Sequence, residues 1–137
     1  MRRTALIALL AASFASVPLQ AADYATYTGK DLFNKFCASC HGTSARGDGP
    51  IAKSLRTRPA NLTTIARRYG GTFPTKRIEE IVDGRVQVIA HGPSAMPVWG
   101  EEFTRSEAGN PDAERDTAQV IHKIVEYLKS IQASASM

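Results

Sequence analysis

Both cysteines of the 137-residue chain lie in one five-residue stretch, Cys37-Ala38-Ser39-Cys40-His41. The two thiols are three residues apart at the end of a segment with helical spacing, and an imidazole follows the second thiol directly. Because this stretch uses every cysteine, no thiol is left to form a second site. The pattern therefore fixes one place at which thiol chemistry can organise the fold.

Two thiols at this spacing can add to the two vinyl groups of haem, and the histidine that follows then ligates the iron. A disulfide between Cys37 and Cys40, or a thioredoxin-like redox pair, would use the same spacing. Both alternatives leave His41 without a role, and a thioredoxin-like pair also expects flanking strands. A zinc site would need two more ligands, drawn from His41, His91, His122 or carboxylates. We therefore interpret the stretch as the covalent attachment site of one c-type haem.

The first residues of the chain have the pattern of a secretory signal. Two arginines precede an apolar run from Ala5 to Val17, and small residues follow at Ala21 and Ala22. The run is shorter than the roughly 20 residues that span a bilayer. We expect residues 1–21 to be a signal peptide that is removed on export to the periplasm; an uncleaved N-terminal anchor is the alternative. No later segment is apolar enough to span a membrane, so residues 22–137 are expected to form one domain without a transmembrane segment.

Composition limits the classes further. Hydrophobic residues at 43% and charged residues at 22% are ordinary for a globular chain, which excludes disordered and collagen-like proteins. Removal of the signal lowers the net charge from +4 to +2, because it takes away two arginines. The basic balance therefore gives no reason to expect a nucleic-acid partner.

Charge is unevenly distributed along the chain. Between residues 46 and 85 there are nine Lys or Arg and four acids, whereas between residues 101 and 116 there are six acids and two Arg. Such an asymmetry can steer a redox partner toward one side of the molecule. A solvated surface with no partner is the alternative interpretation.

Apolar residues recur at helical spacing, and no convincing run alternates as a strand would. The prediction is an all-α fold with three main helices, plus short helices and loops wrapped around the haem. The expected helices cover 28–38, 51–56, 62–68, 75–83 and a terminal segment with Asn110 as its cap and Pro111 in its first turn. Thr75 is the expected N-cap of the fourth helix, and Gly84 is its stop. Glycines and prolines predict loops over 43–50 and 90–100.

The iron of an electron carrier usually has a second axial ligand, which keeps oxygen and peroxide off the metal. Met96 is the one methionine between the two ends of the chain, and it lies in the predicted loop, far enough after His41 to reach the opposite haem face. A thioether ligand favours Fe(II) and raises the reduction potential. His91 is the competing ligand, whereas His122 is expected at the surface or in packing.

These features resemble the bacterial, periplasmic members of the monohaem class I cytochrome c family. The positions that match its terminal helices, haem motif and distal loop are Gly29, Phe33, Cys37, Cys40, His41, Met96, Pro97, Ile124 and Tyr127. The likeness covers essentially all of residues 22–137 and implies one cytochrome c domain. It also implies that the terminal helices cross closely at Gly29, where Phe33 and Tyr127 interlock beside Ile124.

The resemblance extends to the loop after the haem motif. The stretches 47–50 and 58–63 are similar to those of a bacterial subgroup, which implies that the Pro50 carbonyl accepts the ring N–H of His41 and orients the imidazole. Arg58 and Trp99 are candidates, by position, for contacts with the haem propionates.

The family resemblance implies a function as well as a fold. It implies one-electron transfer between redox protein partners, with the iron cycling between Fe(II) and Fe(III) and no enzymatic substrate. A haem-bearing electron-transfer subunit of a periplasmic dehydrogenase or reductase complex is the alternative. A gas sensor or peroxidase-like enzyme would need an open sixth position, against which Met96 argues.

Overall fold

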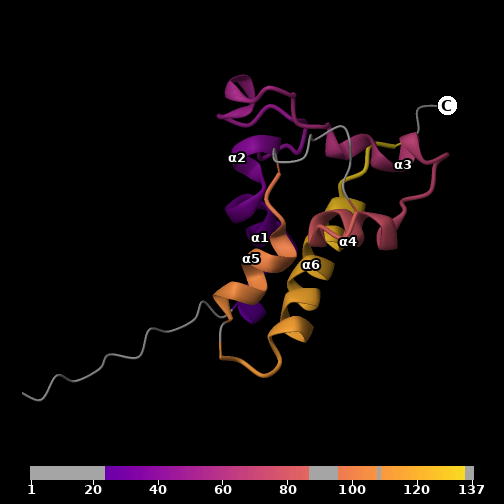
Figure 1. Ribbon diagram of the computed structural model, residues 1–137. Coiled ribbons are helices and arrows are strands. Elements are labelled where there is room, and N and C mark those ends of the chain that lie inside the picture. Colours follow the sequence, from indigo (N-terminus) through magenta and orange to yellow (C-terminus); the bar gives the residue numbers. More distant parts are fainter. Residues whose placement is uncertain (1–23, 87–95, 108, 135–137) are drawn as a thin grey trace, which may run out of the picture.

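The computed structural model describes residues 24–86, 96–107 and 109–134, and over these ranges the chain is helical and contains no strand (Figure 1). The elements in order are η1 (Tyr24–Thr26), α1 (Gly29–Phe36), α2 (Ala38–His41), η2 (Ala52–Ser54), η3 (Leu62–Thr64), α3 (Ile65–Arg68), α4 (Thr75–Asp83), α5 (Trp99–Ser106) and α6 (Ala113–Ser130). The predicted all-α fold is confirmed.

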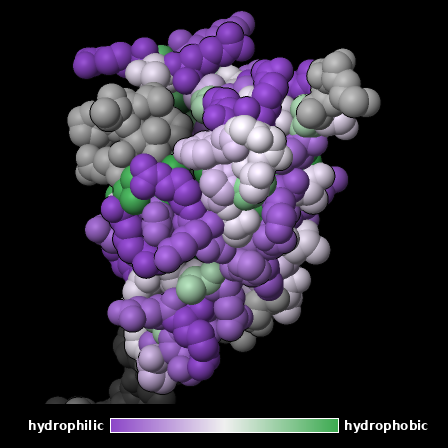
Figure 2. Space-filling view, turned by 90° about the vertical axis from the view of Figure 1, so that its right-hand side faces the viewer, coloured by the Kyte–Doolittle hydropathy of each residue, from purple (hydrophilic) through white to green (hydrophobic). Residues whose placement is uncertain are grey.

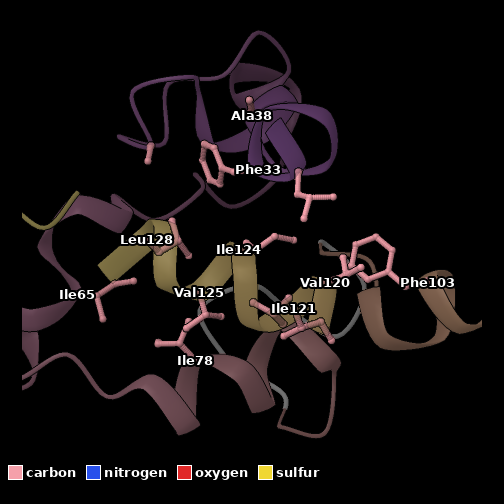
Figure 3. Close-up of a cluster of buried hydrophobic side chains, with 13 residues drawn as sticks. Phe33, Ala38, Ile65, Ile78, Phe103, Val120, Ile121, Ile124, Val125 and Leu128 are labelled. Atoms are coloured by element: carbon pink, nitrogen blue, oxygen red, sulfur yellow. The ribbon is translucent and has the colours of Figure 1, made fainter. Parts of the chain in front are cut away.

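Helix α6 is the longest element, and the other main helices pack on it. Its apolar stripe is buried and consists of Val120, Ile121, Ile124, Val125 and Leu128. Helices α1, α4 and α5 all contact α6. Figure 3 shows Phe33 of α1 and Phe103 of α5 reaching toward this stripe, and Ile78 of α4 approaching it from another side. One hydrophobic core therefore ties the first helix of the described chain to the last.

The sequence explains where α1 begins. Thr28 has extended backbone angles, and its hydroxyl oxygen accepts a hydrogen bond from the N–H of Asp31 at 3.2 Å. The Asp31 carboxylate accepts one in return from the N–H of Thr28, also at 3.2 Å. This reciprocal pair is a capping box, which satisfies two N–H groups that have no partner inside the helix. Leu32 and Phe33 follow on the buried face of α1.

Helix α1 stops just before the haem motif. Cys37 is its C-cap, with its N–H bonded to the carbonyl of Phe33, and the four-residue α2 then carries the chain to His41. The glycine-rich segment after α2 is a loop, as predicted, and only the short η2 forms within the expected helix 51–56. The expected helix 62–68 consists of η3 followed by α3.

The expected starts of two helices were wrong, and one helix was not expected. Pro74, rather than Thr75, is the N-cap of α4, because its carbonyl accepts the N–H of Ile78 at 3.0 Å and so makes Thr75 the first helical residue. The terminal helix begins at Ala113, after a turn in which Asn110 Oδ1 accepts the N–H of Asp112 at 2.9 Å. Helix α5 begins at Trp99, inside the expected loop 90–100, and had not been predicted. The stop of α4 at Gly84 is confirmed, with the left-handed φ of 89° expected of a glycine cap.

The basic and the acidic segments of the sequence form different elements of the fold. Figure 2 shows hydrophilic side chains at the top of the molecule, the end at which Figure 1 places the segment after α2 with its exposed basic residues. Acids lie in the first turns of the two last helices, Glu101 and Glu102 in α5 and Glu114 and Asp116 in α6. Among the helices of the described ranges, none combines the length and apolar character that a membrane crossing requires.

Candidate haem-binding site

A cleft next to α2 brings together residues from three separate parts of the sequence. Its lining consists of Phe36, Cys37, Cys40, His41, Leu55, Thr57, Pro59, Met96, Pro97 and Trp99. Five of the predicted site residues are in this set: both cysteines, His41, Met96 and Trp99. The lining is mainly apolar, and its polar side chains are few, as expected of a site for a large apolar cofactor.

The two cysteines lie on one side of the cleft, held by the α1–α2 junction. The N–H groups of Cys40 and His41 both bond to the Cys37 carbonyl, at 3.2 and 2.9 Å, so the motif forms a single tight turn. Burial, and secondarily the neighbouring Cys40, raises the pKa of the Cys37 thiol to about 12. Redox-active dithiol pairs instead carry a thiol whose pKa is lowered. The raised pKa of this buried thiol therefore disfavours the thioredoxin-like alternative.

The His41 ring is buried, with 7% of the residue exposed. Its Nδ1 lies 3.1 Å from the backbone carbonyl oxygen of Ala60. A carbonyl can only accept, so Nδ1 carries the proton of the ring and Nε2 is the nitrogen with a lone pair for a metal. The same bond fixes the ring plane and increases the basicity of the imidazole.

The acceptor is not the Pro50 carbonyl, so the role predicted for Pro50 from the family resemblance is wrong. Pro50 is an exposed turn residue, whereas the segment around Ala60 lies against the loop that follows His41. Leu62 donates its N–H to the Ala45 carbonyl at 2.7 Å. A Cβ on Gly47 would lie 2.1 Å from the Pro59 carbonyl oxygen, so only glycine permits the approach. This contact brings the Ala60 carbonyl to the imidazole.

A second wall comes from the segment that leads into α5 and from its first residue. Met96 is partly buried and lines the cleft together with Pro97 and Trp99. The Trp99 ring stacks on Phe103 with centroids 5.6 Å apart, and Phe36 of α1 lies against both rings, 5.4 Å from Trp99 and 4.9 Å from Phe103. This aromatic cluster fixes the position of the segment that carries Met96 relative to the helix that precedes Cys37.

A third wall is formed by alternate residues of the segment after η2. Leu55, Thr57 and Pro59 line the cleft, and Leu55 has extended backbone angles. Successive side chains of an extended segment point to opposite sides, and both Arg56 and Arg58 are exposed. Arg58 is therefore not part of the lining. This wall was not predicted from the sequence, although arginines alternate with other residues at positions 55–59, a pattern that indicates an extended segment with two different sides.

The donor set fits a covalently attached haem better than a zinc ion. No three side chains of His, Cys, Asp or Glu converge as a metal site would require, over residues 24–86, 96–107 and 109–134. His122, one of the suggested zinc ligands, is exposed on α6 and pairs with Glu79 at 2.9 Å. His91, the competing axial ligand, lies outside the described residues. Two thiols and one oriented imidazole beside an apolar cleft match the demands of haem attachment.

Comparison with protein families decides the assignment. The family model described as cytochrome c oxidase, cbb3-type, subunit III matches residues 25–110, which is more than half of the chain. The chain belongs to this cytochrome c family. No curated protein and no solved structure gave a match.

As a cytochrome c, the chain carries a covalently bound c-type haem with iron and acts in electron transfer. The matched region contains the cysteine motif, the Ala60 segment and Met96, so all three walls of the cleft fall within it. Its activity requires redox partners, to which the iron gives up or from which it takes an electron.

Proposed function

We propose that this cytochrome is an exported periplasmic electron carrier, with haem attached at Cys37 and Cys40 and iron ligated by His41 and Met96. One observation carries the proposal: the Met96 side chain lines the same cleft as the His41 ring and both thiols, although it comes from a distant part of the sequence. The bound haem supplies a one-electron Fe(II)/Fe(III) couple. The chain's own residues determine how readily that couple is reduced.

Each ligand has a separate effect on the potential. Ala60 polarises the His41 N–H, and a more basic imidazole stabilises Fe(III). The Met96 thioether favours Fe(II) and raises the potential. The apolar lining keeps water away, which also disfavours the more highly charged ferric state. If His41 and Met96 both hold the iron, they would leave no coordination position for a substrate, as expected of a carrier.

Export is the second part of the proposal. The arginine pair, the apolar run and the alanines at residues 21 and 22 support a signal peptide over 1–21, which leaves a cytochrome c domain over 22–137. Covalent haem attachment at a paired-cysteine motif suits an exported protein, because haem lost outside the cytoplasm is not recovered. N-terminal sequencing of the protein purified from the periplasm tests this step: a mature chain that begins near Ala22 is the expected result.

A second candidate function is favoured by the family description, which names an oxidase subunit. By that likeness the chain would be a haem-bearing subunit of a larger redox complex rather than a freely diffusing carrier. Purification under mild conditions distinguishes the two. A freely diffusing carrier elutes alone, whereas a subunit elutes with a large redox partner.

A redox titration of the purified, matured protein, followed by its visible spectrum, tests the central proposal. The expected result is a low-spin, six-coordinate spectrum in both oxidation states and a reversible one-electron transition at high potential. The Cys37→Ala, Cys40→Ala double variant is the control for attachment and should retain no covalent haem. A five-coordinate spectrum, or wild-type haem that extracts freely into acidified organic solvent, would refute the assignment.

A further inference from the structure

The C-terminal end of α6 is fastened to the segment that contacts His41. Gln132, just beyond the helix, donates from Nε2 to the Leu62 carbonyl at 2.8 Å and to the Leu128 carbonyl at 2.7 Å. Its Oε1 accepts the N–H of Ala66 at 2.9 Å. The next residue, Ala133, donates its N–H to the Thr63 carbonyl at 2.8 Å. One side chain therefore joins the last helix to the first residue of η3 and to the start of α3.

The same turn is joined on its other side to the haem motif loop. Leu62 donates its N–H to the Ala45 carbonyl at 2.7 Å, and its own carbonyl accepts the bond from Gln132 at 2.8 Å. Its peptide groups therefore link the loop after His41 to the residue that follows α6. The Ala60 carbonyl, two residues earlier, accepts the hydrogen bond of His41. A continuous chain of hydrogen bonds and short backbone links thus runs from Gln132 to the imidazole.

The turn needs such support because its own helices are short. η3 has three residues and α3 has four, which is too few for stability without tertiary contacts. Asn61 adds local bonds, accepting from the N–H of Thr63 at 3.0 Å and giving its carbonyl to Arg68 at 2.8 Å. Those bonds shape the turn but do not join it to the rest of the protein. Gln132 does join it to α6. Two of its three hydrogen bonds go to Leu62 and Ala66 in the turn, and the third goes to Leu128 near the end of α6.

We propose that Gln132 is a positioning residue for the haem iron: it holds the Leu62–Ala66 turn so that the Ala60 carbonyl keeps its bond to His41 and thereby tunes the potential. This inference rests on the proposed role of His41 as axial ligand. Loosening of the turn weakens the bond from His41 Nδ1 to Ala60, which makes the imidazole less basic. Fe(III) is then less stabilised, so the reduction potential rises.

Two variants and two controls test the proposal in the haem-loaded protein. Gln132→Met has a similar length and makes none of the three bonds, whereas Gln132→Glu keeps an acceptor for Ala66 and loses both donors. Gln119→Met is the matched control, because Gln119 is an exposed glutamine of α6, the helix that precedes Gln132. Ile78→Val controls for general loss of stability, because it removes a methyl group from the core on α4.

The readouts are the reduction potential and the rate at which the Nδ1 proton of His41 exchanges with solvent in the ferrous protein, measured by NMR. For Gln132→Met we expect a two- to threefold shift of the redox equilibrium toward Fe(II), or about 18–28 mV at 59 mV per tenfold. The Nδ1 proton should exchange faster in this variant. Neither control should change either readout.

Gln132→Met and Gln132→Glu variants that lose stability but keep the parental potential and proton exchange would overturn the positioning role. If Gln132→Met does not fold, Gln132→Glu decides through the exchange of the Nδ1 proton, which should be faster than in the parent, because this variant retains the bond from Ala66 but loses both donors. Its added negative charge acts separately on the potential, so the proton exchange is the deciding readout for this variant. Failure of the underlying assignment has a different signature: a His41→Ala variant whose spectrum is the same as that of the parent would show that His41 is not the ligand.

Discussion

Gly29 of α1 lies directly against the backbone carbonyl of Lys123 in α6. A Cβ built on Gly29 would be 2.1 Å from that oxygen and 3.0 Å from the Cβ of Tyr127. Next to this crossing the rings of Phe33 and Tyr127 lie 5.4 Å apart, and Ile124 is buried. The helix contact implied by the family resemblance is thus confirmed. It joins the helix before Cys37 to the helix that ends at Gln132.

Gly29→Ala should destabilise the protein. Ala is favoured over Gly in a helix by up to about 1 kcal/mol, so without the crossing contact the change would stabilise α1. The clash with the Lys123 carbonyl should instead make the variant less stable than the parent. We expect the free energy of unfolding to fall by about 1–3 kcal/mol, the range found for overpacked cores. Denaturant unfolding of the haem-loaded protein measures it, with Lys30→Ala in the same helix as control. A variant as stable as the parent would show that the helices do not touch here.

Thr28→Ala should remove the capping box of α1 at a cost of about 1 kcal/mol. The side-chain and backbone hydrogen bonds from Thr28 lower the pKa of Asp31 from its ordinary 3.8. The pKa of Asp31 is lower in the folded protein than in the unfolded chain. The hydrogen bonds of ionised Asp31 therefore stabilise the fold above pH 3.8, and this stabilisation is lost as the pH falls below that value. The stability difference between parent and variant should therefore narrow in acid. Unfolding curves at several pH values measure it, and a difference independent of pH would contradict the role of Asp31.

Much of the fold follows from local sequence. Apolar spacing identified α1 and α6, because each has one buried face, and the glycine stop at Gly84 identified the end of α4. Helix α5 was missed because Pro97 and Gly100 favour a loop. Its apolar spacing is also weak, because Phe103 is buried, Trp99 is only partly buried, and α5 has no other large apolar side chain. Its position depends on the aromatic cluster beside the cleft, which joins residues from distant parts of the chain. No local rule contains that information.

The site, like the fold, has one part that local sequence predicts and one part that tertiary packing decides. Chemistry identifies Cys37, Cys40 and His41, because thiols and an imidazole are rare and their spacing is specific. The acceptor for His41 has no such signature, since every residue has a carbonyl. The choice between Pro50 and Ala60 is made by tertiary packing. The Gln132 junction was invisible for the same reason, because all its partners are main-chain groups.

Charge near the cleft should control electron exchange with charged reagents. Arg56 is exposed and lies between two residues that line the cleft. At low salt, Arg56→Glu should slow the reduction of the anion hexacyanoferrate(III) by the ferrous protein several-fold. The same variant should exchange electrons faster with the cation hexaammineruthenium. Lys76→Glu on α4 makes the same change in net charge outside the cleft lining and should have a smaller effect. The difference should fade near physiological salt, where screening acts over about 8 Å. Stopped-flow rates at several ionic strengths measure it, and equal effects of both variants would mean that only net charge matters.

Replacement of Met96 tests the ligand that decides the function. If the thioether ligates iron, Met96→Ala should lower the potential, because Fe(II) loses its preferred donor. A fall of about 59 mV is a tenfold change in the redox equilibrium of this one-electron couple, so even a modest loss is measurable by titration. The weak long-wavelength absorption that the family resemblance implies for sulfur bound to ferric haem should disappear as well.

Two further variants separate the identity of the ligand from an open position. Met96→His should stay six-coordinate but have a lower potential than the parent, because imidazole favours Fe(III) more than a thioether does. His91→Ala should leave the spectrum and the potential unchanged if Met96 is the ligand. The reverse pattern, in which Met96→Ala keeps both properties and His91→Ala loses them, would make Met96 a packing residue of the cleft. The protein would then be a cytochrome with two histidine ligands and a lower potential.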